Sequence, residues 1–366
     1  MHPIRITTII GTRPEAIKLM PVIVAARARP DDFEVTVVRT GQHGDMVDRL
    51  MDEFGLQADL NLNVMRPDQD LAHVLSESVR GLSDYMARDR PDWALVQGDT
   101  ATTFAGALAA FYNKVAIGHV EAGLRTGNLH LPFPEEANRC LTARLADLHF
   151  APTEQARVNL MREGLDPSTI HVTGNTVVDA LIRTLARLPD APAAAAAPEG
   201  RYVLVTAHRR ESHGPALERI CAALLLMLEH HPDVTAWLPM HPSPTVRATL
   251  TRLLGTHDRV RLTEPMGYVD FIRALSGASL VLSDSGGVQE ECAVLGKPVL
   301  VLRQDTERLE AVEAGVAIVV GTDARRIADV ASGLLADADR YAAMARRSDA
   351  YGTGTASTQI LDALLS

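Results

Sequence analysis

Short apolar runs rich in β-branched residues alternate with amphipathic segments along the chain. In the first half, strands are predicted at residues 4–10, 34–40, 93–97, 115–120 and 171–174. Helical patterns follow after Pro14, Asp45, Thr100, Thr153 and Thr176. Continuous apolar runs of this length are typical of parallel strands that are buried on both faces and joined through helices. The pattern therefore predicts a doubly wound α/β sheet.

A segment rich in Pro and Ala, residues 188–200, interrupts this pattern and has almost no bulky side chain to bury. After it the alternation restarts, with strands predicted in RYVLVTA, DVTAWLP, RVRLTEP, SLVLSDS, KPVLVLR and VAIVVGT. We therefore predict two Rossmann-like domains, residues 1–187 and 201–351, joined by a linker at 188–200. The last segment, 352–366, is expected to form a helix that packs back on the first domain. Because such sheets bind ligands beyond the carboxyl ends of their strands, we expect the functional site in the cleft between the domains.

Composition narrows the class of protein. The chain has 366 residues, 46% of them hydrophobic and 22% charged, which suits about two domains of ~150–200 residues. A formal net charge of -10 without a basic run argues against nucleic acid as a partner. No segment approaches the ~20 apolar residues of a membrane span, and we expect neither a membrane partner nor a targeting segment. Cys140, Cys221 and Cys292 form no CxxC pair, which indicates neither disulfides nor zinc and favours a reducing, cytoplasmic location.

Polar residues collect where the predicted strands end. In the second half, SDSGGVQEE follows a strand and begins a helix with Ser285, Gly286 and Gly287. Backbone N–H groups at such a helix start can approach an anion at the positive end of the helix dipole, which predicts a seat for a diphosphate. Glu291, further along the helix, is placed to reach ribose hydroxyls of the same nucleotide. The alternative is an ordinary glycine turn that starts a helix.

The stretch GTRPEAIK, residues 11–18, offers a second anion site in the first half. Pro14 suits the first helical turn, and Arg13 and Lys18 supply cations. The stretch is neither a Walker A motif nor a GxGxxG fingerprint, so we expect neither ATP nor NAD as a cofactor. A surface cation is the alternative for Arg13, but its place at a strand end favours contact with phosphate.

Three carboxylates at strand ends of the first half form the candidate acid/base group. Asp99 has the alternative of capping the helix after Thr100, and Glu135 that of complementing a helix N-terminus. Glu121 ends an apolar strand with no helix to cap. Carboxylates that meet in one desolvated cleft raise one another's pKa and become acid/base catalysts. Since consecutive helical residues diverge by about 100°, Glu135 and Glu136 are not expected to face the same substrate atom.

Histidines add one further candidate. His208, in AHRRES, ends the first strand of the second half and is expected across the cleft from the carboxylates, in a protonation state that its neighbours leave open. None of the histidines has HxH or HExxH spacing, so we expect no metal site from His43, His119, His130, His208, His213 and His241.

Taken together, the motifs resemble those of the non-hydrolysing bacterial UDP-N-acetylglucosamine 2-epimerases. The resemblance runs from about residue 4 to the end of the chain and rests on GTRPEAIK, QGDT, HVEAGLRTG, PFPEEANR, TGNTVVDAL, AHRRES, DSGGVQEE, LGKPVLVLR and TERLEAVEAG. It implies the GT-B fold, two Rossmann-like doubly wound parallel-sheet domains with an interdomain cleft, usually as a homodimer. It also implies interconversion of UDP-GlcNAc and UDP-ManNAc without nicotinamide, by elimination of UDP to 2-acetamidoglucal and its re-addition.

The resemblance assigns roles motif by motif. It implies acid/base roles for Asp99, Glu121 and Glu135, and a place near the diphosphate for His208; which carboxylate removes the proton stays open. The expected substrate-binding residues fall into four groups: Arg13 and Lys18 for phosphate or sugar, Ser285, Gly286 and Gly287 for the diphosphate, Glu291 and Arg308 for ribose or phosphates, and Phe271 with the backbone near Met266 for uracil.

Three departures from the family pattern stand out. Gly44 and Asp45 replace part of the usual QHR.M motif, Asp68 stands where many bacterial members have arginine, and Leu309 stands where proline is common. In those members this region binds a second, activating UDP-GlcNAc, together with Gln42, His43, Glu136, Arg210 and His241. Because two added acids repel an anionic diphosphate, we expect weak or absent activation by that ligand.

Other functions remain open at this stage. A hydrolysing epimerase shares the motifs but releases UDP and free ManNAc, and an epimerase acting on a modified UDP-sugar is also compatible with them. A retaining glycosyltransferase would not require all three carboxylates. A catalytically silent nucleotide-sugar sensor would not need an acid at each of the expected catalytic positions. The physiological sugar is not specified by the motifs.

Overall fold

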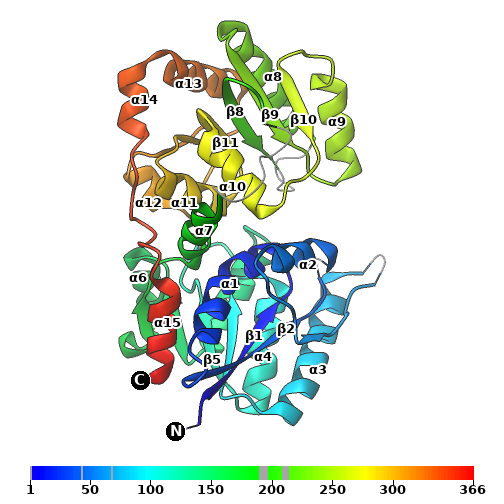
Figure 1. The fold of residues 1–366 in the computed structure, drawn as a ribbon, viewed down its shortest axis with the longest axis vertical. Coiled ribbons are helices and arrows are strands. Elements are labelled where there is room, and N and C mark those ends of the chain that lie inside the picture. The colour runs from blue at the N-terminus through cyan, green and yellow to red at the C-terminus, as the bar shows by residue number, and fades with distance from the viewer. Residues whose placement is uncertain (1, 43, 67–68, 189–196, 208–213) are drawn as a thin grey trace. The chain divides into compact units, whose positions relative to one another are not determined.

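The computed structural model describes residues 2–42, 44–66, 69–188, 197–207 and 214–366. The chain forms two compact units: unit 1 comprises Met1–Ile182 and Gly352–Ser366, and unit 2 comprises Arg183–Tyr351 (Figure 1). The division falls within helix α7 (Thr176–Arg187). Most of the predicted linker lies outside the described residues.

Unit 1 is built on a parallel sheet whose described strands have the order β3-β2-β1-β4-β5-β6-β7. Its strands are β1 (Ile4–Ile10), β2 (Phe33–Arg39), β3 (Leu60–Asn61), β4 (Trp93–Gln97), β5 (Ala116–Val120), β6 (Leu148–Ala151) and β7 (Ile170–Val172). The central strands carry fully buried apolar side chains on both faces, such as Ile9, Ala94 and Leu95. This burial explains why continuous apolar runs predicted them correctly.

Helices pack on both faces of the sheet of unit 1. The helices that the structure describes in this unit are α1 (Arg13–Arg27), α2 (Gly44–Glu53), α3 (Leu71–Asp89), α4 (Ala101–Asn113), α5 (Glu135–Leu145), α6 (Glu154–Arg162), the 3₁₀ turn Pro167–Thr169, α7, and α15 (Ala356–Leu365). Two groups of them can be distinguished by their contacts. Helix α1 packs against α2 and α15, whereas α4 packs against α3 and α5. The connections from β1 and from β4 run in opposite directions along the sheet, and right-handed crossovers therefore place these two groups on opposite faces.

Unit 2 repeats the architecture with a parallel sheet of order β10-β9-β8-β11-β12-β13 among the described residues. Its strands are β8 (Arg201–Thr206), β9 (Val234–Pro239), β10 (Val260–Thr263), β11 (Leu280–Ser283), β12 (Val299–Val301) and β13 (Ala317–Val319). Its helices are α8 (Pro215–His230), α9 (Pro244–Leu254), α10 (Tyr268–Gly277), α11 (Gly286–Leu295), α12 (Leu309–Glu313), α13 (Ala324–Ala336) and α14 (Ala338–Met344). Each predicted strand of this half is present.

Several elements were not predicted from the pattern. Strand β6 was overlooked because its short sequence LHFA contains a histidine; the buried ring of His149 is hydrogen-bonded through Nε2 to the Ala143 carbonyl at 2.9 Å. Strand β3 has only two residues, and α3 was also missed, whereas a helix start at Glu135 was considered and α5 begins there. Helix α3 does carry readable signals, since the Asp70 side chain caps it by accepting from the His73 N–H at 2.8 Å.

The last helix belongs to unit 1. Asp179 is buried, and its carboxylate accepts hydrogen bonds from the Ser357 N–H at 2.8 Å and the Ser357 hydroxyl at 2.5 Å. Arg29 of unit 1 pairs with Asp362 of α15 at 2.8 Å. Helix α15 is therefore fastened at its start and along its length (Figure 1).

Candidate active site

The candidate catalytic residues of unit 1 lie where the strand order reverses. Strands β1 and β4 are neighbours, but the chain leaves them in opposite directions, so the loops after them meet at the switch point where such sheets bind ligands. Gly11 begins the loop after β1 and lies against α4: a Cβ atom at this position would be 2.0 Å from Thr102 Oγ1. Only glycine allows the loop to approach the helix this closely.

Glu121 follows β5 in a backbone conformation that its residue type rarely adopts. Its φ is 65° and its side chain is buried. Oε1 accepts from Lys18 Nζ at 2.5 Å and from Asn175 Nδ2 at 3.0 Å, while Oε2 accepts from Gln97 Nε2. A strained non-glycine residue with three donors on a buried carboxylate is typical of a functional position. The positive charge of Lys18 is therefore paired with the carboxylate of Glu121 within unit 1.

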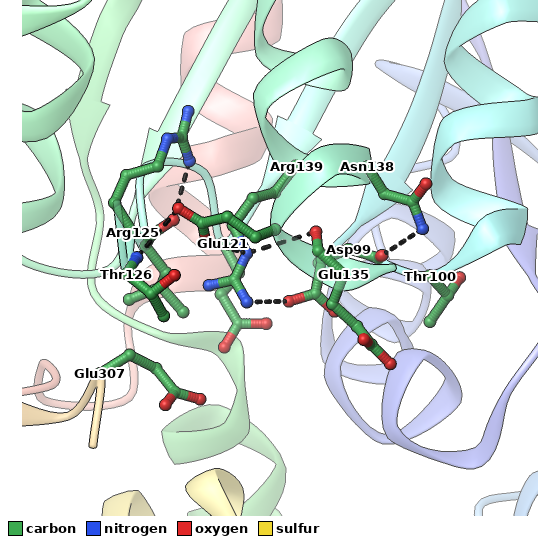
Figure 2. Close-up of polar contacts among 12 residues, drawn as sticks. Asp99, Thr100, Glu121, Arg125, Thr126, Glu135, Asn138, Arg139 and Glu307 are labelled. Atoms are coloured by element: carbon green, nitrogen blue, oxygen red, sulfur yellow. Dashed lines mark hydrogen bonds and ion pairs between the residues drawn. The ribbon is translucent and has the colours of Figure 1, made fainter. Parts of the chain in front are cut away.

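Asp99 lies at the end of β4 and is held from α5. Its Oδ2 atom is 3.0 Å from Arg139 Nη2, and its backbone carbonyl accepts from Asn138 Nδ2 at 2.9 Å (Figure 2). The Asp99 side chain stays 31% exposed, whereas that of Arg139 is 4% exposed. The capping alternative for Asp99 is wrong, because the side chain of Thr100 caps α4 by accepting from the Thr103 N–H.

The two acids that begin α5 have different surroundings. Glu136 is buried: its Oε1 accepts from the N–H groups of Thr126 and Gly127, both at 3.0 Å, and its Oε2 lies 3.3 Å from Arg139 Nε. Glu135 is half-buried at the first position of the helix. Glu136 therefore supports the loop before α5, while Glu135 is the more exposed acid of this pair.

Glu15 was not singled out by sequence reasoning, yet it joins the two loops of the switch point. Its Oε2 accepts from the N–H groups of Gly11 at 2.9 Å and Thr12 at 2.6 Å. Its Oε1 accepts from the Thr100 hydroxyl at 2.5 Å and lies 3.0 Å from the Thr103 hydroxyl. Burial raises the pKa of Glu15, and these hydrogen bonds oppose the rise. The Thr-x-x-Glu spacing of a capping box was the available signal.

This geometry changes the interpretation of GTRPEAIK. The amides of Gly11 and Thr12 already donate to Glu15, so the loop backbone does not offer them to a phosphate. Arg13, half-buried at the start of α1, remains the candidate for contact with an anion. The predicted second anion site therefore depends on side-chain cations and not on the amides of Gly11 and Thr12.

His119 precedes Glu121 by two residues and is fully buried. Its Nε2 lies 2.8 Å from the Gly98 carbonyl and must donate to it, which fixes the neutral tautomer. Burial lowers the pKa of His119 to about 3. The ring therefore links β5 to the residue before Asp99 without carrying a charge.

The candidate phosphate seat of unit 2 also lies at a switch point. Strands β8 and β11 are neighbours, and the hydroxyls of Thr206 and Ser283 are 2.7 Å apart at their ends. Ser285 precedes α11 without a side-chain capping bond, and Gly286 and Gly287 begin the helix. First-turn N–H groups have no acceptor within a helix. The turn therefore has the donor geometry that an anion needs.

Glycine is required at position 286 because the side chain of Arg308 packs against it, and not because of its backbone angles. A Cβ atom there would lie 3.0 Å from Arg308 Cζ, so the guanidinium covers the glycine, whereas nothing lies within 4 Å of a Cβ at Gly287. Arg308 is buried and donates to Glu290 Oε1 at 2.8 Å and Glu307 Oε1 at 2.9 Å. The structure thus places Arg308 at the predicted turn, with its charge compensated by two carboxylates.

The remaining nucleotide candidates cluster around α10. Glu291 is buried in α11, and its Oε1 accepts from the Tyr268 hydroxyl at 2.8 Å. Tyr268, the first residue of α10, carried no recognisable signal in the sequence. Met266 lies half-buried in the loop before α10, and Phe271 half-buried in the first turn. One short segment of unit 2 therefore carries the predicted uracil residues and the partner of Glu291.

Some predictions fall outside the described residues. His208 is one of them, as are His43 and Asp68 in the region of the expected activator; Gly44 begins α2. Among the residues that the structure describes, no group of three or more His, Cys, Asp or Glu side chains could hold a metal ion. Within the same residues, no helix combines the length and apolar character needed to cross a membrane.

Comparison with known proteins identifies the family. The model of the family described as UDP-N-acetylglucosamine 2-epimerase matches residues 25–365. The chain is 46% identical to UDP-N-acetylglucosamine 2-epimerase of Escherichia coli (strain K12), over 98% of each chain, and 45% identical to that of Bacillus subtilis (strain 168), over 100% of this chain and 96% of the relative.

Solved structures agree with this family. UDP-GlcNAc 2-epimerase from Neisseria meningitidis bound to UDP-GlcNAc has a TM-score of 0.94 at 41% identity, covering 99% of this chain and 100% of that chain. MnaA of S. aureus with UDP has a TM-score of 0.90 at 42% identity, covering 98% and 95%. These matches confirm the predicted α/β fold class, two parallel-sheet domains of GT-B type. With these structural and sequence matches spanning both units, the chain belongs to the UDP-N-acetylglucosamine 2-epimerase family.

Proposed function

We propose that the protein interconverts UDP-GlcNAc and UDP-ManNAc without releasing a free sugar. A base removes the proton from C2 while the C1–O bond to UDP breaks, and the electron pair of the C2–H bond forms the C1–C2 double bond of 2-acetamidoglucal. UDP then adds back to C1, and C2 takes a proton on the opposite face. The sequence of steps is redox-neutral and needs no nicotinamide.

The surroundings of Glu121 carry this proposal. A residue with φ of 65° and a buried carboxylate is costly to maintain, by about 1–3 kcal/mol for the backbone strain alone. Donors from Lys18, Gln97 and Asn175 stabilise its ionised form, which is the form that a base requires. We assign proton transfer at C2 to Glu121, Asp99 and Glu135 as a group. Which of the three acts as the base is a question for experiment.

The diphosphate is proposed to bind unit 2. The uncapped start of α11 supplies the N–H groups of Gly286 and Gly287 and the hydroxyl of Ser285 to the departing UDP, while the Ser285 N–H donates to Ser283 Oγ at 3.0 Å. These donors stabilise the charge that develops on the UDP. Glu291 is proposed to accept from ribose hydroxyls, and Met266, Phe271 and Arg308 to complete the nucleotide site. His208 is proposed to assist the departure of UDP, and Arg13 to contact phosphate or sugar. The Neisseria meningitidis and S. aureus relatives, solved with UDP-GlcNAc and with UDP, support a UDP-sugar as the ligand.

Incubation with UDP-GlcNAc in deuterated water, followed by NMR without added nicotinamide, tests the proposal. Deuterium at C2 together with UDP-ManNAc is the expected result. Accumulation of free ManNAc and UDP would instead identify a hydrolysing enzyme. The variants Glu121→Gln and Asp99→Asn should each lose a factor of about 10²–10⁴ in turnover. Asp166→Asn, which alters a carboxylate that caps the turn at Pro167–Thr169, is the matched control and should retain activity.

We further propose a homodimer formed through α3 and α4. A shallow groove of about 530 Å³ runs between these helices. It is lined by the apolar or aromatic residues Ala72, Leu75, Val79, Leu108 and Tyr112 and by the polar residues Ser76, Arg80, Ser83 and Asp84. Phe111 and Tyr112 are 56% and 63% exposed beside it. Large exposed apolar patches mark association sites. Light scattering should give twice the chain mass of 39.5 kDa, and Phe111→Glu should reduce it to one chain.

A cytoplasmic location is proposed on the basis of the cysteines. Cys140, Cys221 and Cys292 are all free, and Cys221 and Cys292 are buried. Thiols that remain unpaired are typical of a reducing compartment. Thiol titration of freshly purified, unfolded protein should find three free groups per chain.

A further inference from the structure

Glu15 occupies a place where a helix would otherwise attract an anion. Helix α1 begins two residues beyond Gly11 at the end of β1, and the helix dipole favours negative charge at its start. The carboxylate of Glu15 accepts there from the N–H groups of Gly11 and Thr12, the two residues that precede the helix. The chain thus supplies its own anion to unit 1, while the corresponding turn of α11 in unit 2 has no side-chain cap.

The other oxygen of Glu15 reaches the loop that carries Asp99. Oε1 accepts from the Thr100 hydroxyl at 2.5 Å, and Thr100 is the next residue after Asp99. On the other side of Asp99, Gly98 is fixed to β5: its N–H donates to the Val120 carbonyl at 2.9 Å, and its carbonyl accepts from His119 Nε2 at 2.8 Å.

The backbone of Asp99 is therefore held from three directions. Asn138 binds its carbonyl from α5, β5 holds the preceding residue, and Glu15 ties the following residue to β1. The tie through Glu15 is buried, since its side chain is 1% exposed. Removing it would free Thr100 from β1 while leaving the other two attachments intact.

We propose that Glu15 is a positioning residue, which fastens the loop of Asp99 to the end of β1 and fills with its own carboxylate the backbone anion site at the start of α1. The inference rests on the proposed acid/base role of Asp99. Because a displacement of a catalytic group by about 1 Å can cost on the order of 10²-fold in rate, the attachment matters for turnover rather than for nucleotide affinity.

The variant Glu15→Ala tests the attachment. Its kcat should fall by about tenfold or more, while the Kd for UDP, whose proposed contacts other than Arg13 lie in unit 2, stays within about threefold of the original value. Glu15→Gln keeps an oxygen for the two amides and an amide group that can donate to the Thr100 oxygen. It should therefore restore kcat to within about fivefold of the original protein.

Asp179 provides the control for loss of stability. It is also a buried carboxylate that accepts from a backbone N–H and a hydroxyl at a helix start, in the same unit but at α15. Asp179→Ala should lower the melting temperature as much as Glu15→Ala does, yet retain kcat within about twofold. Equal losses of kcat in both variants would overturn the proposal, because they would reflect stability alone.

A double-mutant cycle shows whether Glu15 acts through Asp99. In an Asp99→Asn background, Glu15→Ala should reduce kcat by less than about twofold more, since the group it positions has lost its function. Independent, multiplying losses would overturn the proposal. If Asp99→Asn is impaired and Glu15→Ala retains full activity, only this inference fails. If Asp99→Asn itself keeps full activity, the proposed role of Asp99 fails as well.

Discussion

Acidification should destabilise unit 1 through His119. Burial lowers the pKa of this ring from 6.5 to about 3, and its Nε2 donates to the Gly98 carbonyl. Between pH 6.5 and 3 the unfolded chain binds a proton at His119 that the folded chain does not bind. The stability that this histidine contributes is therefore complete above pH 6.5 and is lost progressively as the pH falls toward 3.

The size of the effect follows from the two pKa values. A difference between 6.5 and about 3 corresponds to about 5 kcal/mol of unfolding free energy when the titration is complete. Within the window, the loss is about 1.4 kcal/mol for each pH unit. Because the unfolded ring is already half protonated at pH 6.5, His119 alone should remove roughly 2 kcal/mol between pH 6.5 and 4.5.

The variant His119→Gln isolates this contribution, because an amide can donate to the Gly98 carbonyl but does not titrate. The chain has two tryptophans, Trp93 in β4 and Trp237 in β9. Urea unfolding followed by fluorescence in a Trp237→Phe background therefore reports on unit 1 alone. The advantage in unfolding free energy that the histidine form has over the His119→Gln variant should shrink by roughly 2 kcal/mol from pH 6.5 to 4.5. A difference that stays constant with pH would refute the reasoning.

Two further substitutions test individual contacts. Lys18→Met leaves the buried carboxylate of Glu121 without its cation and should lower the unfolding free energy of unit 1 by about 3–5 kcal/mol, against less than about 1 kcal/mol for Arg27→Met, which breaks an exposed ion pair. Similar losses in the two variants, measured by urea unfolding, would contradict this view. Tyr268→Phe removes the hydroxyl donor to Glu291 and should weaken UDP binding about tenfold while leaving 2′-deoxy-UDP almost unaffected. Calorimetry that finds the same loss for both nucleotides would exclude a link between this contact and the ribose.

Local patterns were sufficient for the central strands of both sheets, whereas the roles of the site residues stay predictions. Apolar runs predicted the central strands because parallel strands buried on both faces need such runs, and acids and glycines at their ends pointed to the switch points. The partners of these residues were beyond local reasoning. Lys18 meets Glu121 across 103 residues of sequence, and Asn175 meets it across 54. Contacts of this kind arise only when the sheet has assembled.

Other features were missed, although part of their signal was readable. Glu15 stands at the capping-box position after Thr12, a signal within four residues. Arg308 is predicted to bind ribose or phosphates, and this role stays a prediction. Its partners Glu290 and Glu307, which share its charge in the folded chain, were not foreseen.

The attachment of α15 to unit 1 has a consequence for biosynthesis. Unit 2 is an insertion between α7 and α15, so the ribosome completes all of unit 2 before it makes the helix that closes unit 1. Until Ser357 emerges, the buried carboxylate of Asp179 lacks the donors that satisfy it in the finished protein. Although domains usually fold in the order of their synthesis, here the unit that starts first can be completed only last.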